Sequence, residues 1–186
     1  MRVVGGIAKG KRLKAVPGHT VRPILDRVKT ALFDVLRPQL AGARVLDLFA
    51  GTGSVGIEAL SQGAAHCVFI DLDSSSLQTI KQNLIHTRLA GKAAVLRRNA
   101  FSFIKNCQAE FDLIYVAPPQ YLGMWIKALR GLDRHPELLA AGGRLIVQID
   151  PKEYEPLRLG KLHELRQKKY GNTLLVFYAR TVQALP

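Results

Sequence analysis

The sequence predicts an α/β domain with a mostly parallel seven-stranded sheet, a C-terminal antiparallel hairpin and a small basic N-terminal arm. Short apolar runs alternate with helical patterns through the middle of the chain, which is typical of a parallel sheet covered by helices on both faces. A glycine-rich loop directly follows the first of these runs. The last two runs leave no room for a helix between them, so they are expected to pair as a hairpin.

The first 37 residues are predicted to form the arm and one helix. Residues 2–18 are basic and interrupted by glycines, which is typical of a hairpin or arm too short to be a domain. From Asp26 to Leu36 apolar residues recur at helical spacing, with Asp26 expected as the cap and Pro38 just beyond the end. Residues 38–180 should form the α/β core, and the whole chain, 1–186, a single domain.

The core elements can be assigned in chain order. Strands are expected at 43–50, 66–71, 93–98, 111–116 and 143–150, and helices at 55–63, 74–89, 100–106 and 124–132, with one helical turn at 136–140. A Ser or Asp cap should start the helix at 74, and Gly63 should close the helix before it. Residues 161–169 and 173–179 should form the hairpin.

Composition excludes several classes of protein. A chain of 186 residues with 48% hydrophobic content suits one globular domain. Cys67 and Cys107 form no CxxC pair and the five His show no ligand spacing, so neither a metal site nor a disulfide framework is expected. The apolar runs are far shorter than the roughly 20 residues of a membrane span. We therefore expect a cytoplasmic monomer with no membrane partner.

The charge indicates a polyanionic partner. The chain carries 27 Lys and Arg against 14 Asp and Glu, a net charge of +13 with a pI near 10.1. Residues 1–37 hold nine basic and two acidic residues, a net +7. The alternatives are a solvated basic face and, less favoured, an anionic membrane surface. The candidate RNA-binding residues are Arg2, Lys9, Lys11, Arg12, Lys14, Arg22 and Arg27.

The glycine-rich loop predicts a nucleoside cofactor. Residues 51–56 read GTGSVG, which satisfies GxGxxG between a strand and a helix. Asp71 lies twenty residues after Gly51, at the end of the next strand, where a carboxylate can accept both hydroxyls of a ribose. Asp47 stands at the strand end, four positions before Gly51. Its charge would repel a pyrophosphate and attract the ammonium of a methionine moiety, which favours S-adenosylmethionine over NAD; a role as a structural cap is the alternative.

The motifs carry a family resemblance. The stretch VLDLFAGTGSVGIEALSQGAAHCVFIDLD resembles the first two strands of class I S-adenosylmethionine-dependent methyltransferases, which have a Rossmann-like fold. The stretches RPILDRVKTALFDVL and FDLIYVAPPQY resemble, more narrowly, the bacterial family that methylates a guanine N2 in small-subunit ribosomal RNA. The resemblance runs from Arg2 to about Ala179. Related N6-adenine methylases share the second of these motifs.

The resemblance implies roles for particular positions. Asp47, Phe49, Ala50, Gly51 and Gly53 would line the methionine end of the cofactor site, and Thr52 is a further cofactor-binding candidate in the same loop. Asp71 would hold the ribose and Leu72 would pack on the adenine. Asn99, with Ala100, would contact the adenine edge; the family usually has Asp there, but an amide oxygen can still accept a hydrogen bond from the adenine amino group.

The acceptor loop departs from the family pattern. The family has Asp or Asn, then two prolines, then an aromatic residue; this chain has Ala117, Pro118, Pro119 and Gln120, with the ring displaced to Tyr121. In the family, the first side-chain oxygen and the first proline carbonyl accept the target N–H groups while the ring stacks on the base. Losing one acceptor should slow transfer on the order of a hundred- to a thousandfold if nothing replaces it; Gln120 is one candidate replacement.

Three functions remain open from the sequence. The first is an RNA guanine-N2 methyltransferase acting on ribosomal RNA or an assembling small subunit. Ala117 favours a second, a catalytically weak RNA-binding or assembly factor that keeps the cofactor pocket. The third, an NAD-dependent oxidoreductase, is opposed by Asp47 and by the lack of a substrate domain after the sheet.

Overall fold

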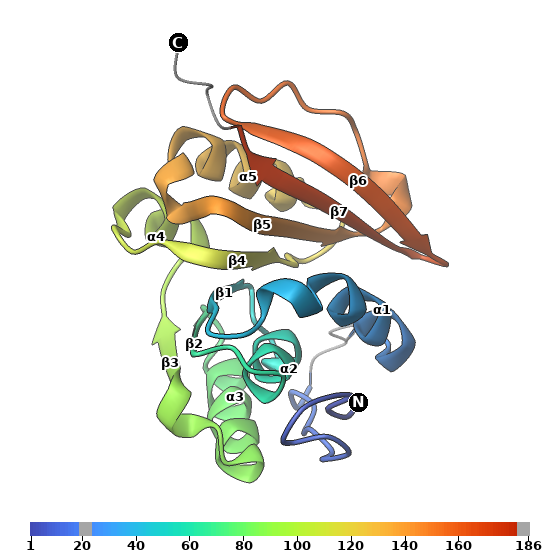
Figure 1. Cartoon of the computed structure of the whole chain (residues 1–186), viewed down its shortest axis with the longest axis vertical. Coiled ribbons are helices and arrows are strands. Elements are labelled where there is room, and N and C mark those ends of the chain that lie inside the picture. The colour runs from blue at the N-terminus through green and yellow to red at the C-terminus, as the bar shows by residue number, and fades with distance from the viewer. Residues whose placement is uncertain (19–23, 182–186) are drawn as a thin grey trace.

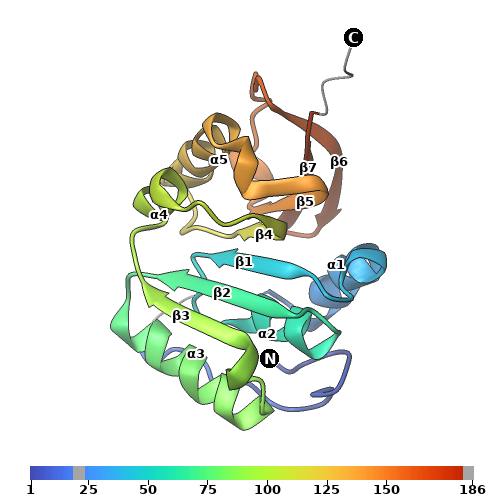
Figure 2. The ribbon, with the colours of Figure 1, turned by 60° about the vertical axis from the view of Figure 1, so that its left-hand side comes forward.

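The computed structural model describes residues 1–18 and 24–181, which form a single mixed sheet with helices on both faces (Figures 1 and 2). The strand order is β3-β2-β1-β4-β5-β7-β6. Neighbouring strands from β3 to β5 are parallel, and β7 pairs antiparallel with both β5 and β6. The predicted class and hairpin are confirmed. The strands are β1 (Arg44–Leu48), β2 (His66–Asp71), β3 (Ala93–Arg97), β4 (Phe111–Val116), β5 (Leu139–Ile149), β6 (Leu162–Tyr170) and β7 (Thr173–Arg180).

The helices cover the two faces of the sheet in two groups. Helices α1 (Asp26–Leu36), α2 (Ser54–Ser61) and α3 (Ser74–Thr87) bury their apolar sides against one face. Helices α4 (Ala100–Asn106) and α5 (Met124–Arg134) bury theirs against the other face, where Trp125 is among the largest buried side chains. Each face therefore has its own hydrophobic core, as the continuous apolar strands require.

Two local predictions are wrong at their boundaries. Leu25, not Asp26, is the N-cap of α1, and the Asp26 carboxylate instead accepts the backbone N–H of Arg2 at 3.3 Å. The expected helical turn at 136–140 ends early, because a 3-10 helix covers Pro136–Leu138 and β5 already begins at Leu139. There Leu139 pairs with Phe111 of β4, so sheet pairing overrides local helix propensity. The expected cap of α3 is confirmed, because Asp73 accepts the N–H of Ser76 at 2.7 Å.

The sheet topology determines where a ligand can bind. Successive crossovers run outward from β1 in one direction through β2 to β3, and from β4 in the other direction. In open α/β sheets, ligands bind at such a reversal, outside the carboxyl ends of the strands. The ends of β1 and β4 are therefore the expected floor of the site.

The N-terminal arm is part of the core. Val3, Ala8, Leu13 and Val16 are all at most 7% exposed. The two halves of the predicted hairpin or arm pair antiparallel at one bridge, between Arg2 and Arg12, and are joined by backbone hydrogen bonds on either side of it. The segment lies beside α2 and α3 (Figure 1), and its backbone also donates to Ser61 of α2 and Asn83 of α3.

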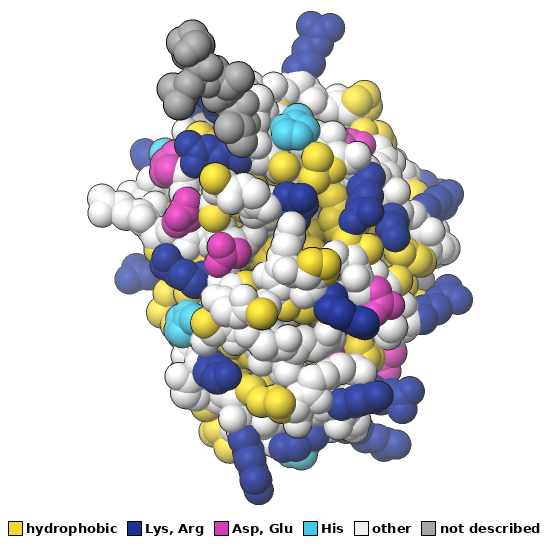
Figure 3. Space-filling view, viewed as in Figure 1, with side chains coloured by type: hydrophobic (Ala, Val, Ile, Leu, Met, Phe, Trp, Pro, Cys, Tyr) yellow, Lys and Arg dark blue, Asp and Glu magenta, His cyan; other side chains and the backbone are white. Residues whose placement is uncertain are grey.

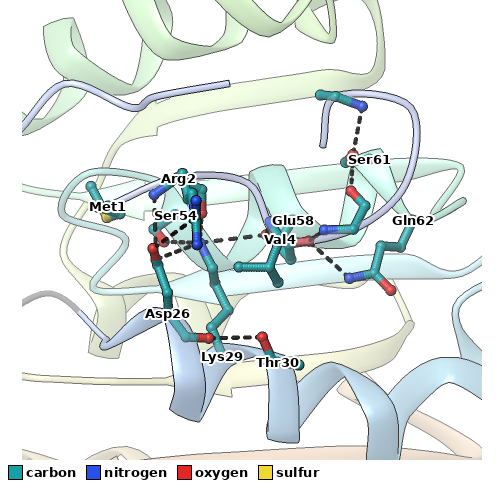
Figure 4. A network of polar contacts seen from close by, with 12 residues as sticks. Met1, Arg2, Val4, Asp26, Lys29, Thr30, Ser54, Glu58, Ser61 and Gln62 are labelled. Carbon is teal, nitrogen blue, oxygen red and sulfur yellow. Dashed lines mark hydrogen bonds and ion pairs between the residues drawn. The ribbon is translucent and has the colours of Figure 1, made fainter. Parts of the chain in front are cut away.

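A buried ion pair holds the arm against α1 and α2 (Figure 4). Glu58 of α2 is fully buried and accepts the backbone N–H groups of Val4 at 2.8 Å and Gly5 at 2.7 Å. Lys29 of α1 places its Nζ 3.4 Å from the Glu58 carboxylate and donates to the Arg2 carbonyl at 2.6 Å. Burial lowers the pKa of Lys29, and the Glu58 carboxylate opposes that shift. Lys29 also donates to Ser54 at 3.2 Å, next to the glycine-rich loop, so one cluster links the arm, α1 and the loop.

Removing the Glu58 carboxylate should destabilise the protein strongly. Glu58→Ala leaves the Lys29 ammonium and two backbone N–H groups of the arm buried without this acceptor, so we expect the free energy of unfolding to fall by about 3–5 kcal/mol. Asp34→Ala is the matched control, because Asp34 pairs with Arg37 on the exposed side of α1 and such pairs contribute under about 1 kcal/mol. Urea unfolding of both variants measures the difference. Equal losses would show that the buried pair does not hold the arm.

Candidate functional site

A cavity of about 640 Å³ lies at the carboxyl ends of the central strands. Its walls come from the glycine-rich loop after β1, the end of β2, the start of α4 and the Pro-Pro loop after β4. These segments are up to about 70 residues apart in the chain, and the topological reversal brings them together. The cavity thus joins the predicted cofactor residues and the predicted acceptor loop in one hollow.

The glycine-rich loop turns sharply where β1 ends. Phe49 has φ +62°, in the left-handed region that a bulky residue rarely adopts, and it packs edge-on against Phe101 with ring centroids 5.9 Å apart. Gly51 and Gly53 also have positive φ, of +54° and +73°. The N–H of Ala50 donates to the carbonyl of Ile70 at 3.0 Å, which holds the turn against β2. The loop therefore presents its backbone to the cavity.

Asp47 is a buried carboxylate at the floor of the cavity. Its side chain accepts the N–H of Gly56 at 3.0 Å, and the residue is only 2% exposed. Burial raises the pKa of Asp47 to about 8, helped by the nearby Asp71 charge and opposed by the Gly56 hydrogen bond. A ligand cation at this point would favour the ionised carboxylate. The preference for a cationic ligand group over a pyrophosphate stays a prediction.

Asp71 is positioned by two backbone donors. One oxygen accepts the N–H of Gly51 at 2.8 Å, and the other accepts the N–H of Asp73 at 3.0 Å. Each carboxylate oxygen keeps acceptor capacity for a further hydrogen bond, as the ribose prediction requires. Leu72 lines the cavity with its side chain 55% exposed, which suits an apolar wall for a flat ring.

Asn99 and Ala100 both line the cavity, but the Asn99 amide oxygen already accepts hydrogen bonds from the protein backbone. It caps α4 by accepting the N–H groups of Phe101 at 3.0 Å and Ser102 at 3.1 Å. The predicted hydrogen bond from the adenine amino group to this oxygen stays a prediction. Thr52 lines the cavity, whereas Gly53 does not. A Cβ on Gly53 would come within 3.2 Å of Ile80, so this glycine permits close packing of α3.

The acceptor loop supplies most, but not all, of its predicted residues to the cavity. Ala117, Pro118, Pro119 and Gln120 line it. Tyr121 does not; the residue is 63% exposed, its φ is +61°, and its N–H donates to the Glu153 carboxylate at 2.7 Å. The predicted stacking role of Tyr121 is therefore not visible in this conformation of the loop.

Eleven further residues line the cavity that were not predicted from the sequence, among them Phe101, Tyr115, Met124 and Gln148. Phe101 and Met124 begin the helices that flank it. Tyr115 and Gln148 come from neighbouring strands, and the Tyr115 hydroxyl donates to the Gln148 amide oxygen. Tyr115 precedes the Pro-Pro motif by three positions, so its place at the strand end was a usable signal. Gln148 gave no local signal, because only the pairing of β5 with β4 brings it to the site.

The candidate RNA-binding residues lie mostly at the surface. Within the described residues, Lys9, Arg12 and Arg27 are exposed and form no ion pair. Arg2 pairs with Asp26 at 3.5 Å. Two lysines lie against α3, where Lys11 donates to the His86 carbonyl and Lys14 donates to Gln82. Arg22 is outside the described residues.

The wider surface is also basic. Figure 3 shows Lys and Arg side chains spread over the face of Figure 1, most densely towards its right-hand and lower sides. Across residues 1–18 and 24–181, no three His, Cys, Asp or Glu side chains gather as a metal site would require. In the same described ranges, no helix is long and apolar enough to cross a membrane.

Fold and cavity together define a class I methyltransferase. Residues 1–179 match the model of the family described as "Conserved hypothetical protein 95", and the chain belongs to that family. It is similar to a Bacillus subtilis protein named "Putative rRNA methyltransferase YlbH", with 38% identity over 97% of this chain and 99% of the relative. It is also similar to the Escherichia coli K12 "Ribosomal RNA small subunit methyltransferase D", with 37% identity over 98% and 91%.

Solved structures agree with this assignment. The chain is similar to the structure titled "Putative methyltransferase yhhF from Escherichia coli", with a TM-score of 0.86 and 31% identity over 98% of this chain and 99% of that one. The match includes both ends of the sheet, so the hairpin and the arm belong to the shared fold.

The buried Asp47 should make stability depend on pH. Its folded-state pKa of about 8 lies above the ordinary 3.8, so the folded protein holds an extra proton between these values and loses stability as pH rises through them. Asp47→Asn lacks the titrating group. We expect its free energy of unfolding, relative to wild type, to rise by more than about 1 kcal/mol from pH 5 to pH 9. Urea unfolding at both pH values tests this, with exposed Asp34→Asn as control. If the difference in free energy of unfolding between Asp47→Asn and wild type were the same at both pH values, Asp47 would not have the raised pKa that burial gives it.

Proposed function

We propose that this protein transfers the methyl group of S-adenosylmethionine to a guanine N2 of small-subunit ribosomal RNA. The observation that carries the proposal is one cavity that is lined both by Asp47 and Asp71 and by the Pro-Pro loop. Family membership and the printed names of the relatives support the substrate class. The proposed substrate is ribosomal RNA or an assembling small subunit, and the protein would act as a monomer.

The residues present fit the cofactor. Asp47 provides a buried carboxyl that the cationic methionine end would favour in its ionised form, Asp71 provides acceptors for the ribose, and Leu72 provides an apolar wall for the adenine. When bound, S-adenosylmethionine supplies an electrophilic methyl group on a sulfonium. The turn at Phe49 and the backbone bonds of Asp71 hold these groups in place before binding, so little ordering is needed on binding.

The Pro-Pro loop would orient the target base. An exocyclic amine is a weak nucleophile because its lone pair is delocalised into the ring, and acceptors on its N–H groups return density to the nitrogen. The Pro118 carbonyl is one such acceptor, held by a residue that is itself buried. Two successive prolines restrict the backbone at this point, which favours a fixed acceptor position.

Ala117 supports a second candidate function. A methyl group stands where the related enzymes present an oxygen, so the chain could retain the cofactor and RNA surfaces as a weakly catalytic assembly factor. The two candidates differ in one measurable respect, the presence of a methylated guanosine that depends on this gene.

Nucleoside mass spectrometry of small-subunit ribosomal RNA decides between them. In cells lacking the gene, we expect one methylguanosine to disappear, to return with the native gene and to stay absent with Asp71→Ala, which removes the predicted ribose acceptor. An unchanged set of methylguanosines would refute the enzyme and favour the assembly factor.

Binding of ribosomal RNA should depend on salt through the arm. Lys9→Glu with Arg12→Glu removes two exposed cations, so we expect weaker binding and a salt dependence of log K reduced by roughly 0.7–0.9 for each phosphate that is no longer neutralised. Charge reversal is preferable to deletion because the arm is part of the core. Lys105→Glu, on the exposed side of α4 across the sheet, is the control and should behave as wild type. Filter binding over a salt series measures the slopes, and equal slopes for all three proteins would exclude the arm from the RNA surface.

A further inference from the structure

The place of the missing acceptor oxygen is beside a polar pair. Val116 of β4 pairs with Val147 of β5, and the next residues in this parallel register are Ala117 and Gln148. Neighbouring strands lie about 4.8 Å apart and residues in register point to the same face, so the Gln148 side chain stands next to the short Ala117. Both residues line the same cavity. The space that Asp or Asn would fill at position 117 is thus within reach of the longer Gln148 side chain.

The Gln148 amide is held in place by a hydrogen bond from Tyr115. The Tyr115 hydroxyl, on the same face of β4, donates to the Gln148 amide oxygen. Tyr115 is 5% exposed, and burial, together with the Asp47 charge, raises its pKa well above the usual range. The hydroxyl therefore remains a donor at neutral pH. An amide oxygen has two lone pairs, so one remains for a second donor.

Building on the function proposed above, we propose that Gln148 supplies the acceptor oxygen that Ala117 lacks, with Tyr115 as its positioning residue. The Gln148 oxygen and the Pro118 carbonyl accept the two N–H groups of the target amine. The amine lone pair forms the new N–C bond as the S–CH3 bond breaks and its electrons return to sulfur, and one amine proton leaves to solvent. Gln148 takes no proton; it only orients and polarises the amine.

Gln148 fits this role better than Gln120. Gln120 lies in the loop, and its amide makes no hydrogen bond within the described residues. Gln148 lies on a central strand between β4 and β7, with its amide already held by Tyr115. Because a preorganised acceptor costs no reordering in the transition state, the strand residue is the more effective one.

Single-turnover methyl transfer tests the assignment. The substrates are naked small-subunit ribosomal RNA and isolated small subunits from cells lacking the gene. With Gln148→Leu we expect the rate to fall on the order of a hundredfold, with cofactor affinity by calorimetry unchanged within about twofold. Adding Ala117→Asn to that variant should raise its rate at least tenfold, because the asparagine returns an oxygen to the same space. Gln167→Leu on β6, where the side chain is exposed, is the matched control and should keep the native rate.

Tyr115→Phe tests the positioning role separately, because it keeps the aromatic ring and so leaves the packing of the side chain unchanged. It removes one hydroxyl, so we expect an intermediate loss of rate, about tenfold, with the folded protein and its cofactor affinity retained. An active native protein whose rate is unaffected by Gln148→Leu would overturn the role of Gln148 and leave the proposed function standing. A native protein inactive on both substrates, with Ala117→Asn inactive as well, would overturn both.

Discussion

The buried pair of Lys29 and Glu58 is the interaction on which the geometry of the cofactor end depends. Two charges removed from water need satisfied hydrogen bonds, and here those bonds come from the arm backbone and from Ser54. Ser54 follows Gly53, which is the N-cap of α2. The position of the arm and the position of the glycine-rich loop are therefore set by the same charges. A basic segment that looks like a surface appendage in the sequence is in this way linked, through Lys29, to Ser54 at the edge of the cavity.

The residues proposed for the cofactor end could be picked out from the sequence because their signals are local. The sharp turn after β1, the carboxylate before it and the acid at the end of β2 all lie within 25 residues of Asp47. The alternation of apolar runs likewise predicted the sheet and its hairpin, since each run reports its own burial. Asp47 and Asp71 could thus be named from their positions and Phe49 from the family resemblance, although not the backbone bonds that hold them.

The acceptor half was harder to predict because it is assembled from distant segments. Gln148 follows Ala117 by 31 positions, and only the register of β5 against β4 places them together. Tyr121 does not line the cavity, and its left-handed backbone and its hydrogen bond to Glu153, 32 positions later, fix the loop at this point. Asp26 failed as a cap for the same kind of reason, because the arm competes for its carboxylate. Contacts between residues so far apart do not alter the spacing of apolar residues within either element, so the sequence pattern does not reveal them.

The two edges of the sheet carry positive charge, and this has a consequence for behaviour in concentrated solution. Strand β6 has one free edge and presents Arg166, Lys168 and Lys169, while β3 on the opposite edge ends at Arg97. Exposed strand edges are templates for pairing between copies, and like charges on both edges oppose that pairing. Screening by salt weakens this repulsion. Low ionic strength should accordingly keep the chains apart, and high ionic strength should bring edge-to-edge aggregation closer.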